Sequence, residues 1–85
     1  MKFYCVYILY SARYDKRYIG YTSNLVERMR SHNYLGKKGF MRRYRPWVVV
    51  HVEYYDEKRE ALDREKYLKS GRGRQWISDH VDFEM

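Results

Sequence analysis

Five side chains in this sequence are of types that together suit chemistry on a phosphodiester: Tyr7, Tyr18, Arg28, His32 and Glu65. An arginine binds phosphate through paired donors and neutralises charge that develops on it. A carboxylate can hold a magnesium ion, and a tyrosine or histidine can transfer a proton. Hydrolysis needs an activated water, a stabilised pentavalent anion and help for the leaving oxygen. The chemistry therefore requires a fold that brings these five groups together.

Two short strands carry the tyrosines. Residues 3–10 predict a β-strand with apolar or aromatic side chains on both faces. Alternation places Tyr4, Val6, Ile8 and Tyr10 on one face and Cys5, Tyr7 and Leu9 on the other. A strand covered on both faces belongs in the middle of a sheet. Residues 18–21 predict a second strand, and the short polar link before it favours an antiparallel hairpin.

The expected hairpin register brings the two tyrosines together. If Leu9 pairs with Lys16, Tyr7 lies directly opposite Tyr18 on one face. Gly20 shares that face and leaves it without a side chain, as close approach by a substrate backbone would need. For a glycine alone, a bulge or a strand end is the commoner explanation.

A helix is predicted to follow the hairpin. Residues 22–24 supply cap-type side chains, and a glutamate stands three positions after the last of them. At about 100° per residue, Leu25 and Met29 form the buried stripe, and Arg28 and His32 lie on its margin. An arginine there can reach the sheet with its head group while its stem packs. The alternative is a surface arginine and a hydrogen-bonded histidine at the edge of the core.

The segment 33–46 has no clear period and is strongly basic. Cations bind phosphates and aromatic rings stack on bases, so its composition resembles a nucleic-acid contact surface. An ordinary solvated loop is the alternative. The expected contacts are Lys37, Lys38, Arg42, Arg43 and Arg45, interleaved with Phe40 and Tyr44 and joined by Gly20 and the later Arg72 and Arg74.

The second half of the chain predicts a strand and two helices. Residues 47–55 are β-branched and aromatic, and the face formed by Val48, Val50, Val52 and Tyr54 is expected to pack beneath a helix. Asp56 is a candidate cap for a helix that runs to about Ser70, with Gly71 placed to end it. Residues 71–77 predict a short helix whose Trp76 and Ile77 close the core. These elements predict an α/β (α+β) fold, a small three-stranded antiparallel sheet flanked by helices.

Glu65 lies at the centre of the apolar stripe that Ala61, Leu62 and Leu68 define on the predicted helix. Burial of a lone carboxylate is costly, so Glu65 is expected to have a cation as its partner. A lysine or arginine could serve, and so could a metal ion.

Length and charge limit the class of protein. The 85 residues predict a single domain, residues 1–85 with a core of about 3–77. A net charge of +7 favours a polyanion, with nucleic acid ahead of membrane. The one cysteine cannot form an internal disulfide and is expected to be a buried thiol in a reducing compartment. No Cys/His spacing suggests zinc, and the N-terminal apolar run is too short to span a bilayer and lacks a signal-cleavage site. A cytoplasmic location is expected, and the oligomeric state stays open.

Four short motifs follow one another along the chain: Cys5-Val6-Tyr7, Tyr18-Ile19-Gly20, Asn24-Leu25 with Arg28 and His32-Asn33, and Ala61-Leu62 with Arg64-Glu65 and Leu68-Lys69. Ten residues separate Tyr7 of the first motif from Tyr18 of the second. In type, order and spacing these motifs resemble those of the GIY-YIG nucleases. The likeness spans about residues 3–77 and is greatest to the small single-domain members.

This resemblance implies a GIY-YIG-like fold and a metal-dependent endonuclease that hydrolyses DNA, in repair or recombination. It implies that Tyr7 acts as the general base, Tyr18 positions the phosphate or water, and Arg28 binds the phosphate. Glu65 would hold one Mg²⁺ or Mn²⁺ ion, and His32 would assist proton transfer or orient Tyr7. Because a free tyrosine has a pKa of about 10, Tyr7 would need Arg28 or a metal-bound water to lower it.

Two positions depart from the family pattern. Cys5 replaces the first glycine, and Ile77 stands where many members have an asparagine that supports the metal ligand. A non-catalytic nucleic-acid-binding module is the rival hypothesis, and a subunit of a larger nuclease assembly is a third. The sequence does not indicate which DNA structure would be the substrate, nor does it exclude RNA.

Overall fold

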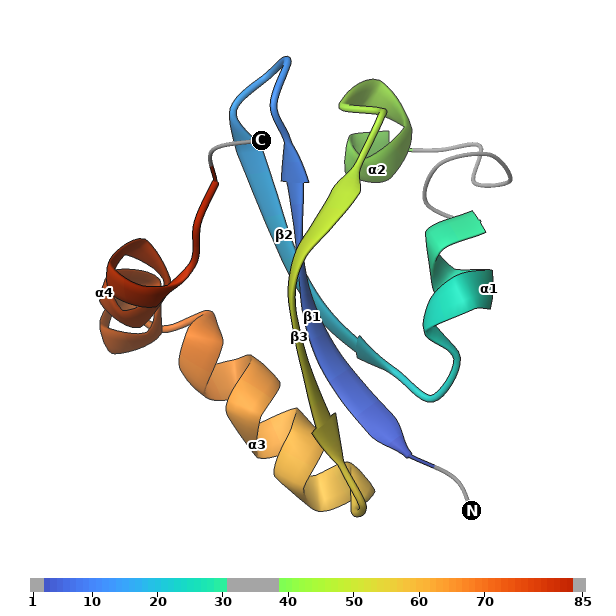
Figure 1. Cartoon of the computed structure of the whole chain (residues 1–85), viewed down its shortest axis with the longest axis vertical. Coiled ribbons are helices and arrows are strands. Elements are labelled where there is room, and N and C mark those ends of the chain that lie inside the picture. Colours follow the sequence, from blue (N-terminus) through green and yellow to red (C-terminus); the bar gives the residue numbers. More distant parts are fainter. Residues whose placement is uncertain (1–2, 31–38, 84–85) are drawn as a thin grey trace.

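The chain folds into three strands and four helices in a computed structural model that describes residues 3–30 and 39–83 (Figure 1). The strands form one antiparallel sheet in the order β2-β1-β3, with α3 and α4 on one face and α1 and α2 on the other. The expected α/β fold with a small three-stranded sheet and flanking helices is confirmed. The elements are β1 (Tyr4–Ser11), β2 (Lys16–Thr22), α1 (Leu25–Arg30), α2 (Gly39–Arg43), β3 (Val48–Tyr55), α3 (Lys58–Leu68) and α4 (Gly71–His80).

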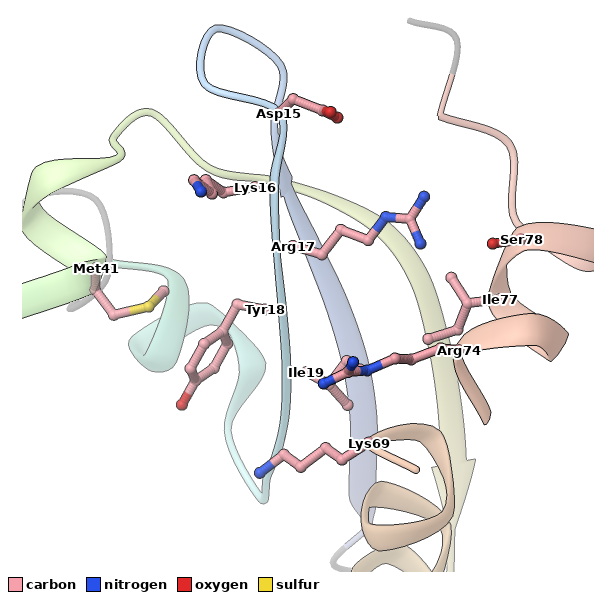
Figure 2. Close-up of a pocket in the computed structure, with 10 residues that line it drawn as sticks. All are labelled: Asp15, Lys16, Arg17, Tyr18, Ile19, Met41, Lys69, Arg74, Ile77 and Ser78. Carbon is pink, nitrogen blue, oxygen red and sulfur yellow. The ribbon is translucent and has the colours of Figure 1, made fainter. Parts of the chain in front are cut away.

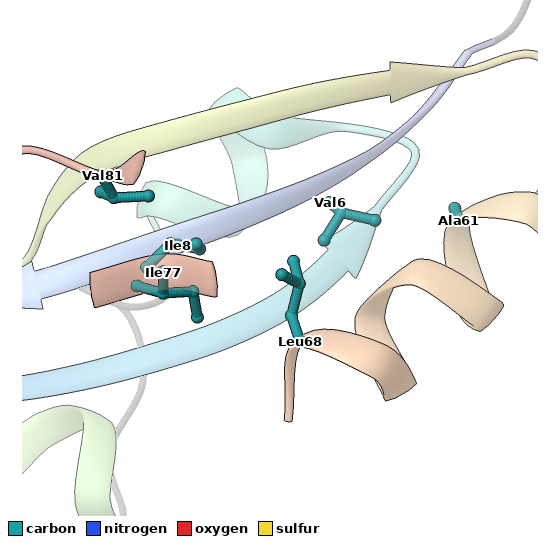
Figure 3. Packing of buried hydrophobic residues seen from close by; sticks show 6 residues of the cluster. All are labelled: Val6, Ile8, Ala61, Leu68, Ile77 and Val81. Atoms are coloured by element: carbon teal, nitrogen blue, oxygen red, sulfur yellow. The ribbon is translucent and has the colours of Figure 1, made fainter. Parts of the chain in front are cut away.

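Strand β1 is central and buried on both faces, as its sequence predicts. Val6 and Ile8 pack with residues of α3 and α4, a group that we call the α3/α4 cluster (Figure 3). Cys5, Tyr7 and Leu9 pack against α1 and α2 in a second group, the α1/α2 cluster. These five side chains are at most 4% exposed. Both helical layers therefore depend on one strand.

The predicted register of the hairpin is wrong by two residues. Ser11 pairs with Lys16, which places Leu9 opposite Tyr18 and Tyr7 opposite Gly20. The turn is tighter than expected because Asp15 adopts a left-handed conformation, φ 51°, which aspartate tolerates better than most residues. A shift of two residues keeps every side chain on its face, so the tyrosines remain diagonal neighbours.

The predicted apolar face of β3 is also wrong, because the β1–β3 ladder contains a bulge at Val50. The extra residue interrupts the alternation of faces. Val50 contacts the α3/α4 cluster, whereas Val49 and Val52 contact the α1/α2 cluster. Tyr54, expected under a helix, is 67% exposed.

Ser70 separates the last two helices. Its hydroxyl accepts a hydrogen bond from the Gly73 amide and begins α4, so Gly71 starts this helix and does not end α3 as expected. A Cβ on Gly73 would collide with the backbone at the end of α3, so the two helices meet closely there. Asp56 is not the cap of α3, which begins after Glu57. The helix predicted over 71–77 is confirmed, and Ile77 is 1% exposed in the core. No helix within residues 3–30 and 39–83 is long and apolar enough to cross a membrane.

A half-buried carboxylate joins β3 to α3. Arg64 Nε donates to Glu53 Oε1 at 2.8 Å, and a second guanidinium nitrogen donates to Oε2 at 3.1 Å. Tyr55 donates to the same carboxylate, and His51 Nε2 lies 2.7 Å from it. Burial disfavours the charged form, but the hydrogen bonds from Arg64, Tyr55 and His51 outweigh it and lower the pKa of Glu53 to about 2. The Arg64 guanidinium also lies 4.5 Å from the centre of the Trp76 ring, which ties α4 to this network.

This pKa predicts a specific acid sensitivity. A carboxyl whose folded-state pKa is below its ordinary 4.5 stabilises the folded state at higher pH, and the contribution is lost as the pH falls towards 2. Between about pH 5 and pH 2, the melting temperature of the parent should therefore fall more steeply than that of Glu53→Gln. Thermal unfolding followed by circular dichroism measures both curves. Parallel curves would contradict the role of Glu53.

Candidate active site

Tyr7 lies across β2, over Gly20. A Cβ built on Gly20 would be 2.5 Å from Tyr7 Oη and 2.7 Å from Cζ, so only glycine leaves room for the ring. The prediction that this open face admits a substrate backbone is wrong, because the Tyr7 ring occupies it. Since β2 is an edge strand, the ring carries the Tyr7 hydroxyl from the central strand towards the edge of the sheet.

Tyr18 lies beside Tyr7, as the sequence predicts for their shared face. The ring centroids are 6.3 Å apart, and Tyr18 also meets Trp47 edge-on at 6.4 Å. The indole of Trp47 is buried and donates to the Met41 carbonyl at 2.8 Å, which fixes the end of α2 against the sheet. The Tyr18 ring is therefore held in place by packing against the rings of Tyr7 and Trp47.

Helix α1 presents Arg28 beside this pair. The Glu27 amide donates to the side chain of Asn24 at 3.1 Å, so the predicted helix cap is confirmed. Leu25 and Met29 pack in the α1/α2 cluster, which confirms the predicted buried stripe. Arg28 is exposed. His32, which the sequence predicts on the same helix as Arg28, lies outside the described residues.

The charges of Arg28 and Glu65 both act on Tyr7. Burial is the largest influence and raises the pKa of Tyr7 well above its ordinary value of 10.0. The neighbouring Tyr18 raises this pKa further, Arg28 lowers it, and Glu65 raises it. Arg28 by itself does not bring the pKa of Tyr7 below its ordinary value, because one exposed guanidinium does not offset the desolvation of a phenol that is 1% exposed. The other expected route, a metal-bound water, stays a prediction. Tyr7 is protonated at neutral pH.

The same influences reveal how the site is assembled. Arg28 comes from α1 on one face of the sheet and Glu65 from α3 on the other, yet both lie near enough to shift the pKa of one phenol. The free edge of β2 is where the two faces meet, and α3 contacts β2 as well as β1. Four of the five candidate residues thus gather around this edge, and the fifth, His32, lies outside the described residues.

Glu65 is paired with a cation, as expected for a carboxylate on the apolar stripe of its helix. Its side chain is 18% exposed, and Lys69 Nζ lies 3.4 Å from Oε1. Within residues 3–30 and 39–83, no group of three or more His, Cys, Asp or Glu side chains could hold a metal ion. A divalent ion at this site would depend on one carboxylate. That donor set fits magnesium, which keeps several waters and takes substrate phosphate oxygens, better than a metal that needs a full protein cage.

A pocket of about 930 Å³ runs along β2 next to the site (Figure 2). Tyr18 lies on the α2 side of the strand, and Lys69 and Arg74 extend towards the strand from the α3–α4 side. Of the four cations that line this pocket, only Arg74 is among the contacts expected from the sequence; Lys16, Arg17 and Lys69 are not. Lys69 stands one helical turn after Glu65, and this spacing could have identified it as a site cation from the sequence. Arg72, an expected nucleic-acid contact, does not line this pocket.

Aromatic contacts extend the basic surface towards α2. Lys16 Nζ and the Arg43 guanidinium lie 5.4 and 5.5 Å from the centre of the Tyr44 ring, and Tyr14 meets that ring edge-on at 5.3 Å. Arg42 and Arg43 are exposed, and Arg45 is half-buried. The other expected nucleic-acid contacts of this segment, Lys37 and Lys38, lie outside the described residues.

Comparison with known proteins gives a consistent result. Residues 3–76 match the family model described as the GIY-YIG catalytic domain. A UPF0213 protein of Clostridium perfringens is 38% identical over 64 residues, 75% of this chain and 68% of that protein. A UPF0213 protein of Natronomonas pharaonis is 35% identical over 65 residues, 76% of this chain and 75% of that protein. The solution structure of a UPF0213 protein from Bacillus halodurans superposes with a TM-score of 0.54 at 25% identity, covering 91% of this chain and 83% of that one.

The contact between Tyr7 and Gly20 can be tested with a matched pair of glycine variants. Gly20→Ala forces the buried Tyr7 ring to move, and overpacking of this kind costs about 1–3 kcal/mol. Gly71→Ala adds the same methyl where nothing lies within 4 Å, and should leave stability unchanged or slightly higher. Chemical denaturation measures both. Equal stability of the two variants would show that the ring does not depend on Gly20.

Proposed function

This chain belongs to the GIY-YIG family, among its small UPF0213 members, and on that basis we propose that it is a metal-dependent endonuclease that hydrolyses phosphodiester bonds in DNA. The family match covers residues 3–76 and makes it a nuclease-type domain. One observation carries the proposal: Arg28 and Glu65 come from opposite faces of the sheet and act on the same phenol, Tyr7. A domain that only binds nucleic acid has no evident need for that arrangement.

The surface chemistry supports a nucleic-acid substrate. The chain carries +7, and four cations line the pocket along β2 beside Tyr18. Arg42 and Arg43 extend the positive surface on α2. Lys and Arg side chains bind the phosphate backbone without reading sequence, so this surface suits recognition of backbone shape and charge. DNA repair or recombination would supply such substrates.

Arg28 and Tyr18 are proposed to hold the scissile phosphate. The guanidinium is exposed on α1 and can offer two parallel donors to phosphate oxygens, which also neutralises charge in the pentavalent state. Tyr18 stands against Tyr7 and Trp47 and orients its hydroxyl by packing. Positioning and charge neutralisation are the main contributions that a protein can make to this reaction.

Tyr7 is proposed to handle the proton of the attacking water. Because burial raises its pKa, it enters the reaction as a phenol that donates a hydrogen bond. It could take the proton of the water only after further positive charge nearby had made it release its own proton to solvent. Glu65 would hold a divalent ion with water and phosphate completing its coordination. The chemistry supplied by that ion would be Lewis-acid polarisation of the phosphate and a lower pKa for neighbouring hydroxyls. Ile77 cannot assist as a ligand, because its aliphatic side chain has no donor atom; it packs in the α3/α4 cluster instead.

A binding module without catalysis is the second candidate, and the raised pKa of Tyr7 favours it. Both hypotheses predict salt-sensitive binding of nucleic acid. They differ in one measurement, cleavage of branched, nicked, mismatched and plain duplex DNA in the presence of Mg²⁺. Binding to these substrates without cleavage would support the module.

The basic surface on α2 predicts a salt dependence. Replacing Arg42 and Arg43 by alanine removes two exposed cations. Each lost phosphate contact should reduce the log–log slope of affinity against salt by about 0.9 on duplex DNA. Fluorescence anisotropy across a salt series measures this slope, with Arg59→Ala as control, since Arg59 is exposed on α3 and pairs with Asp63. An unchanged slope would make the α2 arginines ordinary solvated residues.

Glu65→Gln separates a metal ligand from a structural ion-pair partner. If Glu65 is a metal ligand, replacing its carboxylate by an amide should abolish Mg²⁺-dependent cleavage. Without metal, the variant should be as stable as the parent and should bind DNA in EDTA at least as well. If Glu65 is instead a purely structural carboxylate, Glu65→Gln should leave cleavage intact and cost about 1 kcal/mol of stability or less, because its partner Lys69 is 53% exposed.

Thermal unfolding and DNA binding in EDTA, and cleavage in Mg²⁺, are measured on the same preparations. Glu60→Gln, the same change at an exposed glutamate of α3 that does not line the Glu65 pocket, is the control and should change none of the three. A destabilised Glu65→Gln variant that still cleaves DNA would defeat the single-metal mechanism.

A further inference from the structure

Lys69 belongs to two neighbouring sites at once. It lines the pocket along β2 with Tyr18, Arg17 and Arg74, and it also lines a smaller pocket of about 480 Å³ that contains Glu65. Its stem follows the C-terminal end of α3, where Lys69 is the helix cap. The ammonium can therefore reach either the carboxylate or the cationic pocket from one backbone position.

The contact with Glu65 is loose. The 3.4 Å between Nζ and Oε1 exceeds the usual hydrogen-bond range of about 2.7–3.2 Å, and the lysine side chain is 53% exposed. Exposed lysine pairs of this kind contribute little net stability, since solvent screens them and the long side chain loses freedom. The ammonium is thus easily exchanged for another cation.

The pocket along β2 lies within reach of this ammonium from the same conformation that pairs it with Glu65. Figure 2 shows Lys69 extending towards β2 below Arg74 and Ile19, in the pocket that Tyr18 also lines. A phosphate bound there would meet Arg17 and Arg74 on one side of the strand, whereas Lys16 lies on the side of Tyr18. The ammonium adds one more donor to this group only when the Glu65 carboxylate no longer holds it.

We propose that Lys69 is the internal counter-ion of Glu65 in the metal-free protein, and that it turns to a backbone phosphate in the pocket when a divalent ion takes the carboxylate. The inference rests on the proposed function, which assigns the ion to Glu65. Two cations repel each other at one carboxylate, so binding of the ion displaces the ammonium. Metal and nucleic acid therefore strengthen each other's binding, and this coupling is reciprocal.

Lys69→Gln tests the competition in the absence of nucleic acid. Removing the ammonium should tighten Mn²⁺ binding to the protein by about threefold to tenfold, because the ion no longer has to displace it. Lys66→Gln is the matched control: Lys66 lines the Glu65 pocket but not the pocket along β2. Titration of free Mn²⁺ by electron paramagnetic resonance measures the affinities, with Glu65→Gln to identify the site. Equal Mn²⁺ affinity in the Lys69→Gln and Lys66→Gln variants would overturn the inference.

DNA affinity gives a second readout with the opposite sign. Binding of a short duplex is measured by anisotropy in EDTA and in Ca²⁺, the divalent probe chosen to limit cleavage. The parent and Lys66→Gln should gain affinity on addition of Ca²⁺, and Lys69→Gln should gain less, by about threefold or more. An equal gain in all three would refute the transfer of the ammonium to phosphate.

The outcomes separate this inference from the proposed function. Mn²⁺ binding that Glu65→Gln abolishes but Lys69→Gln leaves unaltered would overturn the role of Lys69 and leave the metal site standing. Mn²⁺ affinity that Glu65→Gln does not change would overturn both, since the carboxylate would then hold no ion.

Discussion

Burial of β1 on both faces is the constraint on which the rest of this structure depends. Val6 and Ile8 can leave water only beneath α3 and α4, and Cys5, Tyr7 and Leu9 only beneath α1 and α2. Two helical layers therefore close on one central strand, and burial of apolar surface is the main favourable term for both. Because Tyr7 belongs to this set, a residue of the candidate site is also a residue of the core.

That double role explains the electrostatics of the site. The packing that fixes the Tyr7 ring over Gly20 also removes its hydroxyl from water, so the rigidity of the phenol and its raised pKa have one cause. A phenol in such a position needs added positive charge before it can release a proton. Under the proposed function, a divalent ion at Glu65 would supply that charge, and the cations around the β2 edge would bind the phosphate.

Two consecutive residues of α3 serve opposite sides of the domain. Arg64 turns towards β3 and forms a bidentate pair with Glu53, while Glu65 lies near Tyr7 and pairs with Lys69. Neighbouring positions on a helix differ by about 100°, so one helix can be anchored to one edge strand and present a carboxylate at the other. The Glu53 network thus holds α3 in the orientation that the candidate site requires.

The sequence by itself predicted the fold class, the three strands and the helices α1, α3 and α4, and it named the candidate residues, because alternation along β1, the cap of α1 and the spacing of the motifs are local properties. It did not predict α2, whose segment has no clear period. The two faces of β1 follow directly from a period of two, and Tyr7 and Tyr18 share a face in either register. Only the tertiary structure decided the partner of Tyr7, the faces of β3 and the residues of the pocket along β2. Because the hairpin turn is two residues shorter than predicted, Gly20 lies beneath the Tyr7 ring. Because of the bulge at Val50, the valines of β3 contact both faces of the sheet. The raised pKa of Tyr7 and the position of Lys69 depend on desolvation and on distances between segments far apart in the chain, which no local pattern records.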